Sequence, residues 1–263
     1  MRLAATRFGE GGTPLLIVHG LFGSGRNWGV IARRLADRGR VVTVDMRNHG
    51  ESGRSEVHGY ADLAADLAET IEAEGGGAEV GASGGAWDVL GHSMGGKAAM
   101  MLALTRPGLV RRLVVADIAP LAYGHSQSHL IAAMRAVDLS ALATRADADA
   151  ALAREGMEEP GVRAFLLQSL DLRERRWRLN LGALDREMDR ITGWPDPDGR
   201  FDGPALFLAG ADSDYVPREA REVIRALFPK ARIARIPGAG HWLHAEKPRE
   251  VEAAVRAFLD ARS

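Results

Sequence analysis

The chain has 263 residues, of which 46% are hydrophobic and 26% are charged, so it is long enough to bury the core of a globular domain. Its 34 basic residues are balanced by 35 acidic ones, and without a basic excess we expect no nucleic-acid partner. Cysteine is absent, which excludes disulfides, thiol catalysis and thiolate metal sites.

Short apolar runs alternate with helical patterns along the first 120 residues. Four runs are rich in β-branched residues and lack polar alternation, which is typical of parallel strands buried on both faces. They lie at 15–18, 41–44, 89–90 and 113–116. Three stretches place apolar residues on one helical face, namely 28–35, 63–71 and 98–106. Strands that alternate with helices predict βαβ units and a mostly parallel sheet, hence an α/β fold.

The pattern changes in the middle of the chain. Residues 121 to about 200 show helical periodicity without a convincing strand, which indicates an inserted helical cap. The α/β pattern then resumes with a buried strand at 205–209 and a half-exposed edge strand at 232–236. A last helix starts at Pro248, since proline is favoured in the first helical turn.

These boundaries predict one structural domain overall. Its α/β core comprises residues 1–120 and 201–263, and the cap comprises residues 121–200. The glycine-rich stretch 75–86 predicts a surface loop between a helix and a strand.

The segment Gly91–Gly96 reads G-x-S-x-G followed by a second glycine, and it lies between a predicted strand and a predicted helix. Small residues at these positions let neighbouring backbone pass close to a strained turn, which lifts the Ser93 hydroxyl out of the sheet. The same turn places a helix N-terminus near a developing oxyanion. The sequence therefore predicts that Ser93 is a nucleophile.

An oxyanion hole needs two backbone N–H groups, one from the residue after the serine and one from an early strand–helix loop. Met94 N–H would supply the first. The segment His19–Gly23 follows the first buried strand, and there Leu21 N–H would supply the second, with Phe22 N–H as an alternative.

A lone histidine in a glycine-containing loop, His241 in the segment Gly238–Trp242, is the candidate general base, because such a base must reach the serine from a different loop. We expect structural roles for other histidines. His92 would pack beside the nucleophile, His19 would shape the oxyanion loop, and His49 would sit in a turn.

Five motifs, which follow one another along nearly the whole chain, carry a resemblance to a known family. They are HGLFGS (19–24), DMRNHGES (45–52), GHSMGGK (91–97), VADIAP (115–120) and GAGHWLHAEKP (238–248). With the chain order serine, acid, histidine, they resemble the α/β-hydrolases, and within them a branch of small serine carboxylesterases found in bacteria and in mitochondria-bearing cells. The resemblance implies an α/β-hydrolase fold, with a mostly parallel sheet flanked by helices and a helical cap inserted after the sixth strand. It also implies a hydrolase that uses no metal.

The acid that would orient His241 is less sharply defined by the residues. The common family pattern G-x-x-D-x-x-V-P aligns with residues 210–217, but its acid position holds Ser213, which cannot carry a charge. The resembled branch takes its acid from the end of the sixth strand, which corresponds to Asp117. We therefore favour Asp117, with Asp212 and Asp214 as alternatives.

Aromatic and histidine side chains near these motifs are candidates for an acyl pocket, although aromatic residues at helical spacing also fit a hydrophobic core. The candidates are His19, His92, Tyr123, Trp177 and Trp242, with Phe165 and Trp194 as further aromatic side chains. The segment Asp45–Gly50 is interpreted as a structured turn rather than a ligand site. Because H-E-x-x-H, G-x-G-x-x-G and G-x-x-x-x-G-K-[ST] are absent, we expect no metal, dinucleotide or nucleoside triphosphate, and so no cofactor.

These residues together predict a serine hydrolase that cleaves small-molecule carboxylic esters, with short to medium acyl chains, through an acyl-enzyme. Thioester hydrolysis, peracid formation and carbon–carbon bond hydrolysis on the same triad are alternatives, and a catalytically silent scaffold is a further one. No apolar run reaches the roughly 20 residues that span a bilayer, and the N-terminus has no signal-peptide pattern, so we expect a cytoplasmic protein. The sequence leaves the oligomeric state open.

Overall fold

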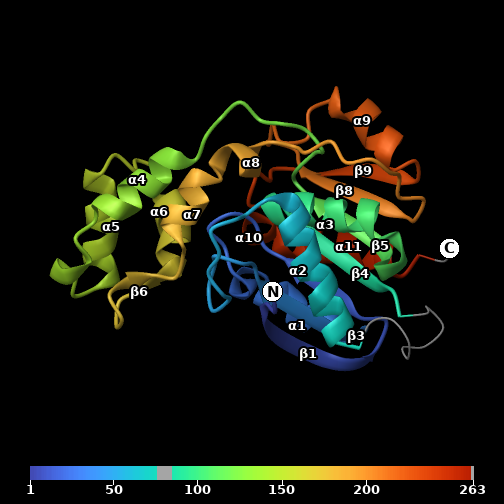
Figure 1. Cartoon of the computed structure of the whole chain (residues 1–263), viewed down its shortest axis with the longest axis horizontal. Coiled ribbons are helices and arrows are strands. Elements are labelled where there is room, and N and C mark those ends of the chain that lie inside the picture. Colours follow the sequence, from blue (N-terminus) through green and yellow to red (C-terminus); the bar gives the residue numbers. More distant parts are fainter. Residues whose placement is uncertain (76–84, 262–263) are drawn as a thin grey trace.

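A seven-stranded sheet forms the centre of the computed structural model, which describes residues 1–75 and 85–261 (Figure 1). Its strand order is β1-β3-β2-β4-β5-β8-β9. The strands are β1 Ala4–Gly12, β2 Leu15–Val18, β3 Gly39–Asp45, β4 Trp87–His92, β5 Val110–Ala116, β8 Ala205–Gly210 and β9 Ala231–Ile236. Strand β1 pairs with β3 in the antiparallel sense, whereas every other neighbouring pair is parallel. The predicted α/β fold with a mostly parallel sheet is therefore confirmed.

Two features of this sheet differ from the sequence analysis. Strand β1 was not predicted, because most of its side chains are exposed and it contains several glycines, so it has no continuous apolar run. The strand before Asp117, counted as the sixth from the family resemblance, is β5, the fifth strand in chain order. The half-exposed strand predicted at 232–236 is β9 and lies at the sheet edge, as expected.

The helices cover both faces of the sheet, since alternate strand residues point to opposite sides. Leu16 and Val42 pack with α2 and α3 on one face, whereas Leu15 and Val41 pack with α1 and α11 on the other. These core helices are α1 Gly29–Leu35, α2 Tyr60–Ala73, α3 Met94–Thr105, α9 Ala220–Leu227, α10 Leu243–Glu246 and α11 Pro248–Leu259, with short 3-10 turns at Gly25–Trp28 and Pro107–Leu109. The glycine-rich stretch predicted as a loop at 75–86 lies mostly outside the described residues.

Residues 121–200, called the helical segment below, stand beside the sheet as a separate group of helices (Figure 1). It contains α4 Ser128–Ala136, α5 Arg145–Arg154, α6 Pro160–Leu166, α7 Leu181–Arg186 and α8 Met188–Thr192, with 3-10 turns at Leu139–Ala141 and Leu167–Ser169. A two-stranded hairpin, β6 Leu170–Asp171 with β7 Arg176–Trp177, interrupts the helices where no strand was predicted. Each of these strands has only two residues, so their sequence carries no strand periodicity.

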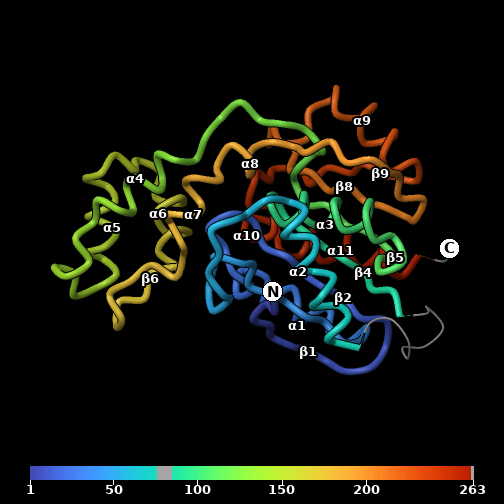
Figure 2. The backbone as a smooth tube through the Cα atoms, in the orientation of Figure 1, coloured from blue at the N-terminus to red at the C-terminus, as the bar shows by residue number. Residues whose placement is uncertain are grey.

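The outgoing and returning connections of the helical segment run side by side (Figure 2). Tyr123 N–H donates to Thr192 O at 3.0 Å and ties the two together. The two connections meet at the carboxyl ends of the parallel strands, where α/β folds bind their ligands. Among residues 1–75 and 85–261, no helix has the length and apolarity needed to cross a bilayer.

Candidate active site

Ser93 lies on the sharp turn between β4 and α3, with the strained left-handed φ of 52° and ψ of −121°. Two glycines make this turn possible, because a Cβ on Gly91 would lie 2.2 Å from Gly95 O. A Cβ on Gly95 would lie 2.3 Å from His19 O. The spacing of the motif is therefore imposed by close backbone approach, and it exposes the serine hydroxyl at the end of the sheet.

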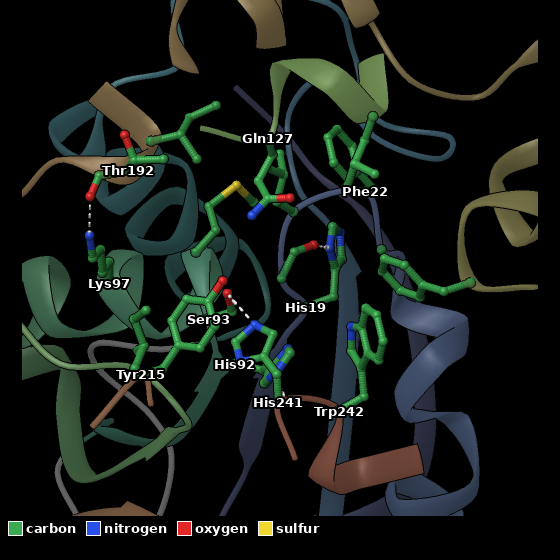
Figure 3. A pocket seen from close by; sticks show the side chains of 18 of the residues that line it. His19, Phe22, His92, Ser93, Lys97, Gln127, Thr192, Tyr215, His241 and Trp242 are labelled. Carbon is green, nitrogen blue, oxygen red and sulfur yellow. Dashed lines mark hydrogen bonds between the residues drawn. The ribbon is translucent and has the colours of Figure 1, made fainter. Parts of the chain in front are cut away.

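Three loops bring Ser93, His241 and Asp117 into one chain of hydrogen bonds (Figure 3 shows the serine–histidine pair). His241 Nε2 lies 3.1 Å from Ser93 Oγ, and His241 Nδ1 lies 2.8 Å from Asp117 Oδ2. Since a carboxylate oxygen only accepts, Nδ1 carries the proton and Nε2 is the acceptor for the serine hydroxyl. This is the arrangement that activates a serine nucleophile.

Asp117 is fully buried and its carboxylate is held by further donors. Gly210 N–H donates to Oδ1 at 2.8 Å, and the Ser213 hydroxyl donates to Oδ2, the oxygen that also faces His241. The two alternative acids, Asp212 and Asp214, lie exposed on the turn that follows β8. Of the three candidates, the structure brings only Asp117 to the histidine.

Ser213 and Tyr215 contact Asp117 and His241 and were not predicted from the sequence. Ser213 was set aside because it carries no charge, yet its place in the G-x-x-D-x-x-V-P pattern marks it as facing the histidine loop. The Tyr215 ring stacks on the His241 ring at a centroid distance of 3.9 Å. Burial, followed by the charge of Asp117, raises the pKa of Tyr215.

Two backbone N–H groups that the sequence predicts as oxyanion donors have no hydrogen-bond partner within the described part of the chain. They belong to Met94, at the start of α3, and to Leu21, in the predicted oxyanion loop (residues 19–24, called the oxyanion loop below). Phe22 N–H, the alternative donor, instead donates to His49 Nε2 at 3.1 Å. The geometry therefore favours Leu21 over Phe22 as the second donor.

An apolar pocket of about 290 Å³ opens beside Ser93. Four of the five expected lining residues, His19, His92, Tyr123 and Trp242, border it, as does Phe165. Further lining side chains that were not predicted include Tyr60, Lys97, Gln127, Leu130, Val162 and Ile191. Several of these come from the helical segment, whose position relative to the sheet has no local sequence signal.

The structure corrects the expectation for Trp177. This side chain is buried away from the pocket, and its indole N–H donates to Met134 O at 2.8 Å. Trp177 lies on the strand β7 and not on a helix, and it packs in the hydrophobic core rather than at a ligand site. Trp194 also lies outside the pocket lining, with its ring 6.3 Å from that of Tyr60.

Lys97 is a buried lysine on α3 that borders the pocket (Figure 3). Its ammonium donates to Thr192 O at 2.9 Å and to Gly193 O at 2.6 Å, at the end of α8. The ammonium also lies 4.6 Å from the centre of the Tyr123 ring. Burial lowers the pKa of Lys97 to about 7, and no acidic side chain among the described residues pairs with it.

His92 is held beside Ser93 as a neutral side chain. Its Nε2–H donates to His241 O at 2.9 Å, because a carbonyl oxygen only accepts. Burial, followed by the neighbouring His244 and His241, keeps the pKa of His92 well below its ordinary value. Within residues 1–75 and 85–261, no group of three or more histidine and acidic side chains is arranged to hold a metal ion.

Comparison with known proteins places this geometry among characterised folds. Residues 15–254 match the family model described as "Alpha/beta hydrolase family". The chain is 42% identical over 250 residues to "Esterase YbfF" of Escherichia coli (strain K12), covering 94% of this chain and 93% of that protein. It is 39% identical over 261 residues to "sn-1-specific diacylglycerol lipase ABHD11" of Mus musculus, covering 95% and 82%. The solved structure of a marine microorganism esterase is 36% identical with a TM-score of 0.90, covering 98% of this chain and 99% of that one.

Proposed function

Since the chain belongs to the alpha/beta hydrolase family and has esterases as relatives, we propose that it hydrolyses carboxylic esters through an acyl-enzyme on Ser93. One observation carries the proposal. Ser93 Oγ lies 3.1 Å from His241 Nε2, the opposite ring nitrogen of His241 lies 2.8 Å from a buried Asp117 oxygen, and the pair opens onto an apolar pocket.

The first half-reaction acylates the serine. Ser93 Oγ attacks the ester carbonyl carbon while His241 Nε2 takes the hydroxyl proton. The carbonyl oxygen becomes negatively charged and is stabilised by the N–H groups of Leu21 and Met94, which have no other partner among residues 1–75 and 85–261. The bond from carbon to the alcohol oxygen then breaks, and His241 gives its proton to the departing alcohol.

The second half-reaction releases the acid. His241 takes a proton from water, whose oxygen attacks the acyl carbon, and returns that proton to Ser93 Oγ as the acyl–serine bond breaks. Asp117 keeps the proton of His241 on Nδ1 and stabilises the cationic ring in each transition state. Gly210 N–H and the Ser213 hydroxyl hold the Asp117 carboxylate in place for this task.

The helical segment supports a preference for short to medium acyl chains, and we propose that it acts as a cap. It contributes Leu130, Val162 and Phe165 to the pocket wall, so the pocket is closed on that side. A cavity of about 290 Å³ is at the small end of the range for ligand pockets, which is roughly 300–1,000 Å³. The run of charges at 171–176 leaves the hairpin without a broad apolar surface for a lipid interface.

A fluorophosphonate probe and a panel of p-nitrophenyl esters from acetate to palmitate test the proposal. The probe should label Ser93 once per chain, and Ser93→Ala should lower kcat by about 10⁶-fold, the order seen when a serine nucleophile is removed. Turnover should peak at short to medium chains. Labelling of another serine, or near-normal turnover in Ser93→Ala, contradicts the proposal.

A second candidate is hydrolysis of longer-chain glycerides, because relatives at 39–40% identity are named sn-1-specific diacylglycerol lipases. The same triad would serve, and the difference would lie in the pocket. Strong activation by emulsified long-chain glyceride, with little turnover of dissolved short-chain esters, would favour this candidate over the first.

A further inference from the structure

The turn at residues 45–52, which the function above leaves unused, joins the core to the helical segment. Gly50 N–H donates to Arg178 O at 2.8 Å, and Asn180 N–H donates to Asn48 O at 2.9 Å. The Asn180 side-chain amide also donates to Asn48 Oδ1 at 3.0 Å. These bonds make a short backbone ladder between the turn and the segment that returns towards the pocket.

The turn is also fixed rigidly to the core. Arg47 makes a bidentate, buried ion pair with Asp66 on α2, at 2.6 and 2.8 Å. Asp45 accepts from Gly25 N–H at 2.8 Å and from Glu51 N–H at 2.9 Å through its two oxygens. A side chain that projects from this turn is therefore held in one orientation.

That side chain is His49, which is 1% exposed and meets the oxyanion loop. Its Nε2 accepts from Phe22 N–H at 3.1 Å, and its Nδ1–H donates to Arg47 O at 2.9 Å. Because an N–H only donates and a carbonyl oxygen only accepts, these two contacts define one neutral tautomer. Burial, followed by the neighbouring His19, lowers the pKa of His49 to about 3, in agreement with that state.

The bond to Phe22 N–H matters because Phe22 has an unfavourable backbone. Gly23 N–H donates to Gly20 O at 3.0 Å and closes a four-residue turn, in which Phe22 has a φ of +62° while Leu21 does not have a positive φ. This is a type II turn, which ordinarily has glycine at that place. Without a restraint, a phenylalanine there would favour the type I turn, in which the peptide between Leu21 and Phe22 is flipped.

We propose that His49 is a positioning residue for the oxyanion hole. By accepting from Phe22 N–H it fixes the Leu21–Phe22 peptide, and it thereby holds in one conformation the turn that carries Leu21 N–H beside Met94 N–H. Because the turn at 45–52 is also hydrogen-bonded to the helical segment, His49 links the geometry of the oxyanion hole to the position of that segment. This inference rests on the proposed ester hydrolysis, since it assigns a role within that reaction.

Two substitutions separate the acceptor from the shape of the side chain. His49→Phe keeps a flat ring but removes the acceptor, whereas His49→Gln keeps an acceptor oxygen near the place of Nε2. We would measure kcat and KM with p-nitrophenyl butyrate, and the affinity for a trifluoromethyl ketone, which forms a tetrahedral oxyanion on the serine. His49→Phe should lower kcat and the ketone affinity by about 10²-fold each, the order for loss of one oxyanion donor, while KM changes less than about threefold. His49→Gln should keep most of the wild-type kcat and ketone affinity.

The outcomes distinguish this inference from the proposed function. A wild-type protein that neither hydrolyses esters nor reacts at Ser93 overturns the proposed function. Wild-type turnover that depends on Ser93, together with a His49→Phe variant of normal kcat and ketone affinity, overturns only the role of His49. Equal losses in His49→Phe and His49→Gln overturn it as well.

A measurement on the wild-type protein covers the case in which His49→Phe does not fold. Nitrogen-15 spectra of labelled histidine report which ring nitrogen carries the proton. We expect His49 to show a protonated Nδ1, and an unprotonated Nε2 coupled through its hydrogen bond to Phe22 N–H. A protonated Nε2 on His49 would overturn the inference.

Discussion

At the scale of single residues, the environment of Asp117 decides how the histidine is oriented. Its buried carboxylate accepts from His241, Gly210 and Ser213, and the residue itself has a strained φ of 49°. A neutral amide at this position could not accept from all these donors and would favour the wrong imidazole tautomer.

Asp117→Asn should therefore keep the fold but lower kcat by about 10⁴-fold, the loss known for the same change in a serine protease triad. Steady-state kinetics with a dissolved p-nitrophenyl ester, alongside a thermal melt, measures both quantities. Asp212→Asn and Asp214→Asn are matched controls, because those carboxylates are exposed, and each should lower kcat by less than about tenfold. A large loss of kcat in Asp212→Asn, with a small loss in Asp117→Asn, would refute the assignment of Asp117.

Ser213 offers a second test at this scale. Its hydroxyl donates to the Asp117 oxygen that faces His241, so it stabilises the carboxylate in both the ground state and the transition state. A hydrogen bond to a charged group contributes about 1.5–3 kcal/mol, and only part of this differs between the two states. Ser213→Ala should thus lower kcat by about tenfold, measured with the same ester, and Ser213→Thr should retain the rate. A loss as large as that of Asp117→Asn would contradict this supporting role.

The residues that the sequence could predict are those that carry their own local pattern. Ser93 lies between glycines that its turn requires, His241 is preceded by two glycines, and Asp117 follows a buried strand. Ser213 and His49 act through contacts with loops that are distant in sequence. No local pattern specifies such contacts, because each depends on how two loops that are far apart in the sequence meet in the folded chain.

At the scale of elements, the turn between β4 and α3 tolerates no side chain at Gly95. An added Cβ would lie 2.3 Å from His19 O and 2.7 Å from Val18 O, which are backbone atoms of β2 and its loop and cannot move alone. Gly95→Ala should therefore displace both the nucleophile and the oxyanion loop. We expect a loss of kcat of at least about 10²-fold, because both donors of the oxyanion hole lie on these loops, and a lower melting temperature.

Gly161→Ala is the matched control for that change. Gly161 lies in α6, where an added Cβ would meet nothing within 4 Å. Because alanine is favoured over glycine in a helix by about 0.8–1.0 kcal/mol, the melting temperature should be unchanged or higher, with normal kcat. An active, stable Gly95→Ala variant would show that the turn can relax, contrary to this argument.

Strands with a local apolar pattern were predicted, whether that pattern was continuous or alternating. The strands β2 to β5 and β8 contain apolar runs, and the half-exposed edge strand β9 alternates, whereas β1 is mostly exposed and has neither pattern. A helical cap at 121–200 was expected, but most of the side chains by which it borders the pocket were not. The position of this segment depends on long-range contacts such as Lys97 with Thr192, which join separate parts of the chain.

At the scale of the whole molecule, buried histidines determine the response to acid. Burial lowers the pKa of His19 to about 4, of His49 to about 3, of His58 to about 2 and of His244 to about 4, and keeps that of His92 well below its ordinary value. In the unfolded chain each would titrate near pH 6.5. Between these values the unfolded state binds more protons than the folded state, so the free energy of unfolding must fall as the pH is lowered.

The protein should therefore unfold in mild acid. Each such histidine contributes a slope of about 1.4 kcal/mol per pH unit below pH 6.5, so several together exceed a typical stability of about 5–15 kcal/mol within a few pH units. We expect the melting temperature to drop steeply between pH 6.5 and pH 5. Because this range lies above the ordinary pKa values of carboxylates, the drop would report on the histidines and not on the carboxylates. His58→Gln removes one of these titrations and should make the dependence shallower, by about one proton per molecule unfolded. A melting temperature that stays constant from pH 6.5 to pH 5 would show that these rings gain protons in the folded state. That result would also contradict the assignment of a neutral ring to His49.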